Sequence, residues 1–357
     1  MKFTTNYKEN NYEIIVEYGA LNLNYDFTQY DKRIALIDEH VYGLHSVAIE
    51  SFIKQHHIEK MLIPFGEQVK TSAHYIKFTE QILTKRVTRN SCLFAIGGGA
   101  TGDFTGFIAA TVLRGIHFIQ IPTTILAHDA SIGGKTGINA TTGKNLIGAF
   151  KRPDKVIYDL NFLKTLSQTE KLSGFAEIIK HVILSSTGNI NESKSLLQLM
   201  NDIPDKHALS HLNEIERWIT FGIKTKMQVI LEDEFENGIR KHLNFGHTFG
   251  HAIEFHHKLP HGVAVLHGII FALILSDAEK SDLTIVLTWM KRLGLQRLNF
   301  EEFNIYNKLM QNDKKNEASH INFVVYNALT GFHIRQFEGV QLQQTFEMLR
   351  KLEGEFL

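Results

Sequence analysis

Three histidines lie in one short stretch of this sequence and could bind a metal ion. His247 and His251 are four residues apart, so both rings would lie on one face of a helix, and His261 follows soon after. Paired histidines at this spacing are typical of zinc sites, and a catalytic zinc needs three protein ligands and one open position. The alternative is a pair of surface or hydrogen-bonded core histidines. Spacing alone leaves open whether His247, His251 or both would bind the metal.

An acidic residue on an apolar segment could complete such a site. Glu177 and Lys180 are three residues apart in a segment that is otherwise apolar from Phe175 to Ile179, so they would share one face of a helix. A carboxylate on an apolar face needs a partner, because burying an unpaired charge is costly. A metal ion would be such a partner, and the sequence therefore predicts that this segment contributes to the metal site.

A glycine-rich turn, Gly97 to Asp103, follows the apolar run Cys92 to Ile96. Where a glycine-rich turn connects a strand to a helix, no side chains keep the backbone amides from approaching a pyrophosphate. The N-terminus of the helix adds partial positive charge. The spacing differs from that of the ordinary dinucleotide-binding fingerprint, and a tight structural turn with Asp103 as N-cap is the alternative. Two more loops, Gly66 to Lys70 and Thr123 to Thr124, are predicted at the same edge of the sheet. The three loops together favour a dinucleotide site.

A second glycine-rich segment carries two lysines. Lys135 lies within Asp129 to Asn139, and Lys144 and Asn145 follow it closely. Flexible backbone of this kind can bring ammonium groups onto a phosphate or a cofactor. The spacing does not match a P-loop, and a solvated loop is the alternative interpretation.

The elements that would position these residues change in type along the chain. Strands and helices alternate over the first part, which predicts a mainly parallel sheet covered by helices, whereas helical spacing prevails from about Leu160. The sequence therefore predicts an α/β nucleotide-binding domain over 1–155 and a mostly α-helical metal- and substrate-binding domain over 156–357, with the site in the cleft between them. The expected strands are Tyr12 to Val16, Arg33 to Ile37, Met61 to Pro64, Cys92 to Ile96 and Phe118 to Ile121. The expected helices of the second part are Leu172 to Ser185, Ile215 to Leu231, Thr248 to His257, Val263 to Ser276 and Leu283 to Leu293.

Composition narrows the possible partners and the compartment. The chain of 357 residues has 38 basic and 38 acidic residues, so no basic excess indicates nucleic acid or an anionic membrane as a partner. The single cysteine, Cys92, lies in an apolar run and is expected to be a buried, unreactive thiol, which fits a reducing compartment. Without an apolar signal core at the N-terminus or a stretch approaching about 20 apolar residues, the expectation is a soluble cytoplasmic protein.

These motifs occur together in a known family. The chain resembles the 3-dehydroquinate synthase family of the sugar-phosphate cyclase superfamily, whose fold is shared with iron-type alcohol and glycerol dehydrogenases. The resemblance rests on G-G-G-x-x-G-D, P-T-T, D-A-S-x-G-G-K-T-G-I-N, G-K-N-x-I-G, A-E-x-I-K and L-N-x-G-H-T-x-G-H-A, which occur in family order from about Gly66 to His261. It implies the dehydroquinate synthase-like fold and a lyase of the shikimate pathway, which leads to chorismate and the aromatic amino acids. The implied reaction converts DAHP into 3-dehydroquinate and phosphate by NAD-dependent oxidation, phosphate elimination, reduction, ring opening and intramolecular aldol closure.

The resemblance also implies roles for individual residues. Glu177, His247 and His261 would bind a divalent metal, zinc or cobalt, whereas His251 would contact the substrate. The implied contacts to the substrate phosphate are Lys135, Asn145 and His251, with Arg114, Lys314 and Lys315 as further candidates. Lys226, Arg240 and Asn244 would hold the carboxylate end, and Lys180 is a further substrate contact. The implied NAD contacts are Asp38, Glu67, Lys70, Gly99, Ala100, Thr101, Gly102, Asp103, Thr123, Thr124, Asp129, Lys144, Phe162, Leu163, Lys164 and Thr165. A homodimer is implied by the resemblance alone.

One position departs from the family pattern. The family commonly reads H-G-E-A-V where this chain has His261-Gly262-Val263-Ala264-Val265, so a carboxylate near His261 is missing. That change bears on the orientation of His261 and on metal affinity.

Three other functions compete with this interpretation. A related cyclase acting on another sugar phosphate would share the cofactor and the metal, but Lys226 and Arg240 favour a substrate that carries a carboxylate. A polyol dehydrogenase would accumulate NADH, and the lysine-rich phosphate pocket argues against it. A non-catalytic binding protein would not need the complete metal set beside the glycine loops.

Overall fold

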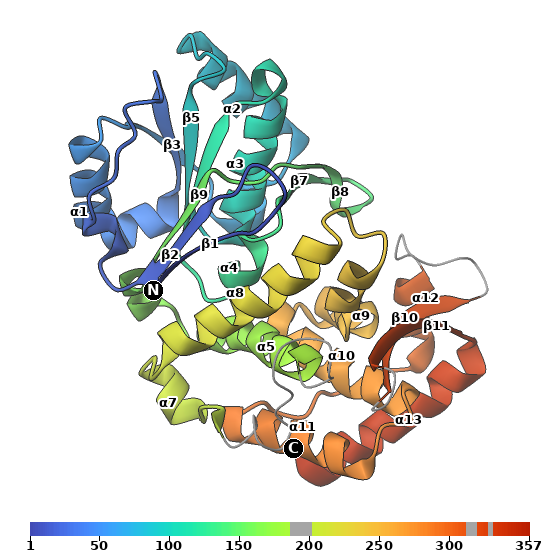
Figure 1. Ribbon diagram of the computed structural model, residues 1–357. Coiled ribbons are helices and arrows are strands. Elements are labelled where there is room, and N and C mark those ends of the chain that lie inside the picture. Colours follow the sequence, from blue (N-terminus) through green and yellow to red (C-terminus); the bar gives the residue numbers. More distant parts are fainter. Residues whose placement is uncertain (186–201, 312–319, 328–330) are drawn as a thin grey trace. The chain divides into compact units, whose positions relative to one another are not determined.

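The computed structural model describes residues 1–185, 202–311, 320–327 and 331–357 (Figure 1). By their contacts, the residues form two compact units, of which the first comprises Met1–Ser167 with Glu216–Met227 and the second Gln168–Ile215 with Gln228–Leu357. The predicted domain boundary lies after residue 155, so the first unit extends past it. It takes in strand β9 and most of helix α8 (Ile215–Glu232), from its second residue to Met227.

The first unit is built on a seven-stranded sheet with the strand order β1-β2-β9-β6-β5-β3-β4. All neighbouring strands are parallel except β1 and β2, which are antiparallel. This is the predicted α/β unit with a mainly parallel sheet, and the prediction is confirmed. The strands are β1 (Lys2–Thr4), β2 (Glu13–Glu17), β3 (Arg33–Asp38), β4 (Glu59–Ile63), β5 (Cys92–Gly97), β6 (His117–Pro122) and β9 (Lys155–Asp159).

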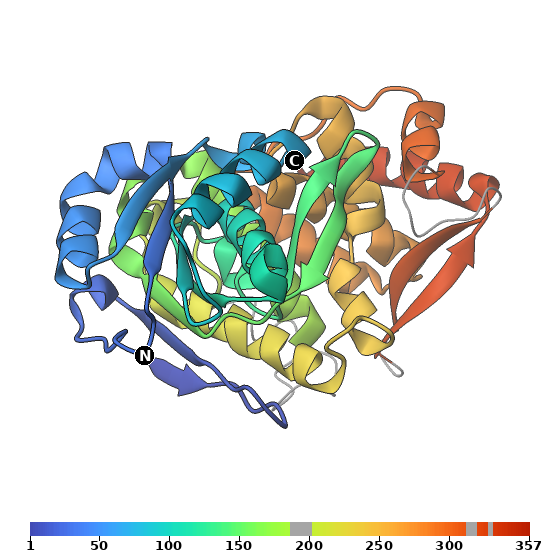
Figure 2. The same cartoon turned by 90° about the horizontal axis from the view of Figure 1, so that it is seen from above.

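Strand β5 shows why the sheet is buried on both faces. All six of its residues are buried, as expected for a central parallel strand that helices cover on both sides. Phe94 belongs to the core cluster under α1 (Glu39–Gln55), and Leu93 belongs to the cluster under α2 (Ser72–Thr84) and α3 (Gly99–Thr111). Figure 2 shows the same sheet between these helices. The remaining short helices of this unit are η1 (Ala20–Asn22), η2 (Gly66–Val69), η3 (Val112–Arg114), α4 (Ala127–Ala130) and η4 (Leu160–Thr165).

The lysine- and glycine-rich segment forms an antiparallel hairpin of β7 (Lys135–Ala140) and β8 (Gly143–Phe150) beside α3. Gly106 of α3 allows this packing, because a Cβ there would lie 2.4 Å from Cγ2 of Thr136. The hairpin was not predicted from the sequence.

The second unit is mostly helical, as predicted. Its central helix, α10, is buried over nearly its whole length, and α5, α9 and α13 pack around it. Within α10, Nδ1 of His267 bonds Oε1 of Glu353 from α13 at 2.5 Å, which ties these two helices together. The helices of this unit in the part of the chain that the structure describes are α5 (Gln168–Ser185), α7 (Lys206–Ser210), η5 (Ile239–Asn244), α9 (His247–His257), α10 (His261–Leu275), α11 (Lys280–Leu293), α12 (Phe303–Gln311) and α13 (Gly339–Phe356), besides the ends of α8. An unpredicted antiparallel hairpin of β10 (Ile321–Asn327) and β11 (Gly331–Phe337) completes the unit.

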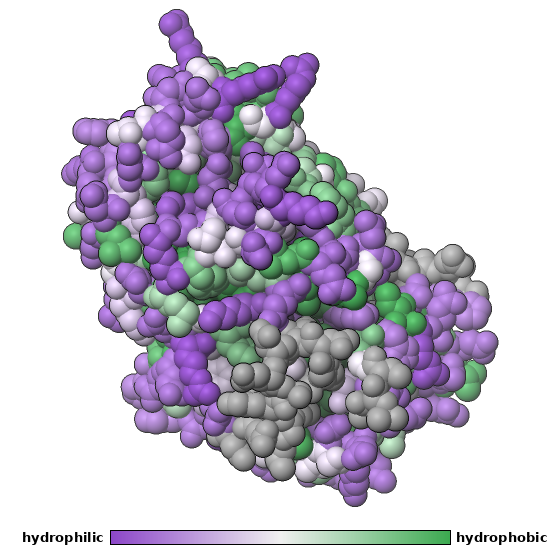
Figure 3. All heavy atoms as spheres, viewed as in Figure 1, coloured by the Kyte–Doolittle hydropathy of each residue, from purple (hydrophilic) through white to green (hydrophobic). Residues whose placement is uncertain are grey.

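Hydrophilic side chains cover most of the face drawn in Figure 3, as expected for a chain in which 21% of the residues are charged. Among the described residues, no helix combines the length and the apolar character that crossing a bilayer requires.

Candidate functional site

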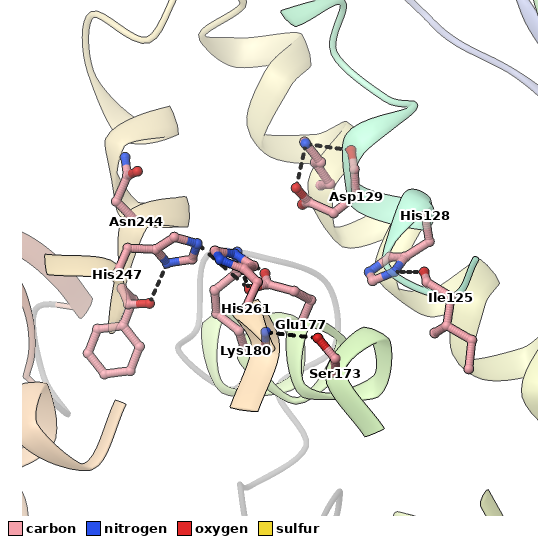
Figure 4. Close-up of polar contacts among 12 residues, drawn as sticks. Ile125, His128, Asp129, Ser173, Glu177, Lys180, Asn244, His247 and His261 are labelled. Carbon is pink, nitrogen blue, oxygen red and sulfur yellow. Dashed lines mark hydrogen bonds and ion pairs between the residues drawn. The ribbon is translucent and has the colours of Figure 1, made fainter. Parts of the chain in front are cut away.

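The predicted metal ligands meet in the second unit, where three helices converge (Figure 4). Glu177 comes from α5 and is buried, while His247 and His261 are the first residues of α9 and α10. Oε1 of Glu177 lies 3.7 Å from Nε2 of His247 and 3.5 Å from Nε2 of His261. These separations are long for hydrogen bonds, but atoms that bind one tetrahedral zinc at ordinary lengths lie about 3.3–3.4 Å apart. Both separations are therefore compatible with ligands of a single ion, and nitrogens of the two histidines lie within 4.8 Å of one another.

The other nitrogen of each histidine ring is held by an acceptor. Nδ1 of His247 lies 3.1 Å from the carbonyl oxygen of Phe245, and Nδ1 of His261 lies 2.8 Å from Oε2 of Glu254. In the neutral form of each ring, the acceptor holds the proton on Nδ1 and the lone pair lies on Nε2, which faces Glu177. This is the tautomer that a metal-binding histidine needs. His261, whose pKa is raised to about 9 in the metal-free protein, would lose its Nε2 proton when the metal binds.

His251 belongs to the same cluster. Nitrogens of His247, His251 and His261 lie within 4.8 Å of one another, so the helical spacing has brought the predicted pair together with the third histidine. The assignment of Glu177, His247 and His261 as ligands, and of His251 as a substrate contact, stays a prediction.

The charge state of the cluster suits a cation. Burial raises the pKa of Glu177, but the charge of buried Lys180, with which it forms an ion pair, outweighs burial, and the pKa lies well below its usual range. Burial and the neighbouring Lys180 hold the pKa of His247 well below its ordinary value. An ionised carboxylate and a neutral imidazole are therefore present near neutral pH, as metal binding requires.

Two glycines allow the three helices to approach closely at the cluster. A Cβ on Gly262 would lie 1.8 Å from the carbonyl oxygen of Ser173, so α10 touches the backbone of α5 directly beside His261. A Cβ on Gly268 would lie 1.9 Å from the carbonyl oxygen of Gly246, where α9 begins. Any larger residue at either position would push the helices that carry the ligands apart.

The residues predicted to hold the carboxylate of the substrate in this unit are Arg240 and Asn244, both on η5. Arg240 is buried, and its guanidinium donates a hydrogen bond to the carbonyl oxygen of Glu234. Nδ2 of Asn244 donates to Oε1 of Glu236 at 3.0 Å. The loop before η5 is shaped by Asp233, whose carboxylate accepts hydrogen bonds from three backbone amides, those of Asn237, Gly238 and Arg240.

In the first unit, the glycine-rich turn forms the start of α3 after strand β5. The N-cap is Gly98, no side chain caps the helix, and Asp103 lies within its second turn. The alternative interpretation of Asp103 as an N-cap is therefore wrong. Its carboxylate instead binds Nζ of buried Lys70 at 2.6 Å.

Lys70 contacts residues from several of the loops predicted to bind ligands in this unit. Besides Asp103, its ammonium group contacts Oδ1 of Asn145 and lies 3.9 Å from Oε1 of Glu67. Thr123, at the carboxyl end of β6, donates its amide to the carbonyl oxygen of Gly97 at 3.0 Å. Segments that are far apart in the sequence thus meet at the carboxyl edge of the sheet, as predicted.

Asp38 and Asp129 have structural partners in this unit. Asp38 is the N-cap of α1, and its second oxygen accepts the amide of Gly66 at 3.0 Å, so it fixes the loop that carries Glu67 and Lys70. Lys226, from the part of α8 that belongs to this unit, donates to the carbonyl oxygen of Asp129 at 2.6 Å and to its Oδ2 at 3.0 Å.

The predicted contacts Phe162 to Thr165 directly follow strand β9, which is parallel to β6, so they also lie at the carboxyl edge of the sheet. Phe162 and Leu163 are buried, and Thr165 bonds the ring of His45 at 2.7 Å. Nζ of Lys164 donates to Oδ1 of Asn161 at 2.8 Å. Arg114 lies beyond the end of α3, roughly 20 Å along the helix from Gly99.

The hairpin separates two residues of the predicted phosphate pocket. Lys135 pairs with Phe150, whereas Asn145 lies toward the tip, roughly 15 Å away along the strand. The structure therefore does not bring their backbones together. Lys144 is exposed near the same tip, and Lys314 and Lys315 lie outside the described residues.

Sequence reasoning missed Glu254, Asp233 and Glu236. The signal for Glu254 was present, because it follows His247 by seven residues, which is two helical turns and therefore the same face of α9. The other two residues lie in a loop, where no periodicity shows which way a side chain points.

Comparison with known proteins gives consistent results. Residues 60–173 match the family model described as 3-dehydroquinate synthase N-terminal, and residues 174–316 match that described as 3-dehydroquinate synthase C-terminal. The 3-dehydroquinate synthase of Macrococcus caseolyticus (strain JCSC5402) is 65% identical over 357 residues, which is 100% of both chains. That of Staphylococcus saprophyticus is 45% identical over 354 residues and 98% of each chain.

A solved structure of 2-deoxy-scyllo-inosose synthase, complexed with carbaglucose-6-phosphate, NAD+ and Co2+, has the same fold. It matches with a TM-score of 0.87 over 98% of this chain and 99% of that chain, at 21% sequence identity.

Proposed function

The chain belongs to the 3-dehydroquinate synthase family, and from that premise we propose which of its residues carry out the reaction. The enzyme converts DAHP, a seven-carbon keto acid phosphate, into 3-dehydroquinate and phosphate. This is a carbon–oxygen lyase reaction of the shikimate pathway toward the aromatic amino acids. A homodimer and a location in the cytoplasm stay predictions from the sequence.

The observation that carries the proposal is the geometry of Glu177, His247 and His261. Their donor atoms are spaced as ligands of one ion, and both histidines have their Nδ1 atoms held by acceptors. These three residues would hold the divalent metal, zinc or cobalt. When bound, the metal supplies a Lewis acid for substrate oxygens, and NAD supplies a hydride acceptor that is restored by the end of the reaction.

The first unit would hold NAD at the carboxyl edge of its sheet. No side chain caps the N-terminus of α3, so the backbone amides of its first turn can face an anionic pyrophosphate. The Lys70 ammonium, paired with Asp103, fixes the position of this carboxylate beside the turn. The full set of proposed NAD contacts is the one implied by the resemblance.

The substrate carries negative charge at both ends, a carboxylate at one and a phosphate at the other, and the chain offers cations for each end. Lys180, whose ammonium group pairs with Glu177, brings a buried positive charge next to the ligand cluster. Lys226, Arg240 and Asn244 would bind the carboxylate. The phosphate contacts that the resemblance implies are Lys135, Asn145 and His251. The hairpin holds the backbones of the first two roughly 15 Å apart, and Asn145 is the one that contacts Lys70 at the carboxyl edge of the sheet. Holding both ends fixes the chain of the substrate for the closing aldol step.

Phosphate release from DAHP tests this function. The purified protein is given NAD and Zn2+ or Co2+, and free phosphate is measured while the absorbance of NADH is followed. We expect phosphate to be released over many turnovers without accumulation of NADH, and EDTA to abolish the release.

Two competing activities give different results in the same assay. A sugar phosphate that lacks a carboxylate would be the better substrate of a related cyclase. Steady formation of NADH from a polyol, without phosphate release, would identify a dehydrogenase and contradict the proposal.

A further inference from the structure

Glu254 lies beside His261 on the side of the ring opposite to Glu177. Its Oε2 accepts a hydrogen bond from Nδ1 at 2.8 Å, while Nε2 of the same ring lies 3.5 Å from Oε1 of Glu177. One imidazole is therefore held between two carboxylates, one at each nitrogen. The bond to Glu254 determines which nitrogen keeps its proton and which presents a lone pair to the cluster.

Helix geometry places Glu254 there. His247 and Glu254 are seven residues apart on α9, so both lie on the face that carries the cluster, with His251 between them. The chain then turns at Lys258, which has a left-handed backbone (φ 55°), and α10 begins at His261. Glu254, near the end of α9, therefore contacts the first residue of α10.

No acidic residue of α10 could replace this carboxylate. The first turn of α10 contains no acidic side chain, and the position two residues after His261 is Val263. The side chain of Glu254 is 16% exposed and that of His261 is 29% exposed, so their hydrogen bond is largely shielded from water. A charged acceptor in such a setting makes a stronger bond than a neutral one.

We propose that Glu254 is a positioning residue for the metal site, which holds the ring of His261 with Nε2 directed at the metal. The inference rests on the proposed function, because it takes Glu177, His247 and His261 as the ligands. The two histidines are then oriented by different acceptors, a backbone carbonyl for His247 and a carboxylate for His261. The carboxylate makes the His261 imidazole the more basic ligand, and its loss weakens metal binding.

A purely structural tie between α9 and α10 is the competing explanation, and metal binding separates the two. In Glu254→Ala the acceptor is removed, whereas in Glu254→Gln an amide oxygen of the same size can still accept from Nδ1 without the negative charge. Glu301→Ala is the matched control, because Glu301 forms the same kind of pair with Nε2 of His256, at 2.9 Å, outside the ligand cluster.

The experiment uses the full-length protein after removal of metal. Zn2+ is titrated in competition with a chelator, bound metal is measured by elemental analysis, and the visible spectrum of the Co2+-loaded protein reports ligand geometry. We expect Glu254→Ala to bind Zn2+ about 10- to 100-fold more weakly, with a changed Co2+ spectrum, and Glu254→Gln to recover part of the affinity. Glu301→Ala is expected to bind like the wild type.

Two further measurements distinguish a loss of metal affinity from a loss of folding, and a wrong role for Glu254 from a wrong set of ligands. The Tm of each metal-free variant is compared with that of the wild type, so that a loss of folding is not mistaken for a loss of affinity. Wild-type affinity and an unchanged Co2+ spectrum in Glu254→Ala would overturn the inference. His261→Ala tests the ligand set itself, and if it also retained Zn2+ the proposed metal site would fail, whatever the role of Glu254.

Discussion

His261 has a carboxylate near each nitrogen, and this placement makes the stability of the metal-free protein depend on pH. Burial lowers the pKa of His261, but Glu177 and Glu254 outweigh burial and raise it to about 9. A histidine whose pKa is raised by folding stabilises the folded state fully below its unfolded pKa of about 6.5, and this contribution is lost as the pH rises through the folded pKa.

We therefore expect the Tm of the metal-free wild type to fall between about pH 6.5 and pH 9, relative to metal-free His261→Gln. Circular dichroism of both proteins across this range checks the prediction. A Tm difference between them that stays constant with pH would contradict it.

Glu177 has two tasks, binding the metal and neutralising Lys180, and mutation can separate them. Glu177→Gln leaves the buried ammonium group of Lys180 without its carboxylate, so we expect loss of bound metal and a free energy of unfolding about 3–5 kcal/mol lower. The double variant Glu177→Gln/Lys180→Met should regain stability but not metal. Urea unfolding and elemental analysis measure the two effects, and full metal content in Glu177→Gln would rule out Glu177 as a ligand.

Among the elements, the close approach of α10 to α5 is the most sensitive to a small change. Gly262→Ala would place a Cβ 1.8 Å from the carbonyl oxygen of Ser173 and 2.9 Å from Cβ of Ala176, so the helices would have to separate beside the ligands. We expect the free energy of unfolding to drop by about 1–3 kcal/mol or more and zinc to be bound more weakly.

The matched control for this prediction is Gly339→Ala at the start of α13, where an added Cβ would have no atom within 4 Å. Its stability is expected to be unchanged or raised by up to about 1 kcal/mol. Urea unfolding of both variants measures the difference, and equal stabilities would mean that the contact between α10 and α5 tolerates a side chain.

Elements with strong local patterns could be predicted from the sequence, and elements that depend on distant pairing could not. Thr248 to His257 was expected to be a helix and α9 spans His247–His257, because apolar residues recur there at helical spacing. Strand β5 was expected from its continuous apolar run. The hairpin β10–β11 was missed, because its strands carry no clean alternation between apolar and polar residues.

The candidate site divides in the same way. The ligand cluster could be predicted because two of its histidines share one helix and the acid lies on an apolar one. The contacts of Lys70 with Asp103 and Asn145 could not, since they join three segments that only the folded sheet brings together. Glu254 is an intermediate case. Its seven-residue spacing from His247 predicts that both lie on one face of a helix, but only the folded structure shows that this face contacts His261.

At the scale of the molecule, the reactivity of the single cysteine measures whether the sheet of the first unit is folded. Cys92 is fully buried in the central strand β5, and burial raises the pKa of its thiol well above the usual range. We expect no reaction with a thiol reagent at pH 8 in the native protein and one thiol per chain in 6 M guanidinium, with labelling in urea that follows the unfolding of the first unit. Prompt labelling of the native protein would show that β5 is accessible.

The path of the chain between the two units has a consequence for how the protein is made. The first unit contains residues 216–227, which are synthesised only after residues 168–215 of the second unit. When the last strand of the sheet emerges, Lys226, which binds Asp129, has not yet been translated. A nascent chain that ends at residue 167 therefore lacks residues 216–227 of the first unit. For the same reason, a recombination event with a single crossover cannot transfer the complete first unit to another gene.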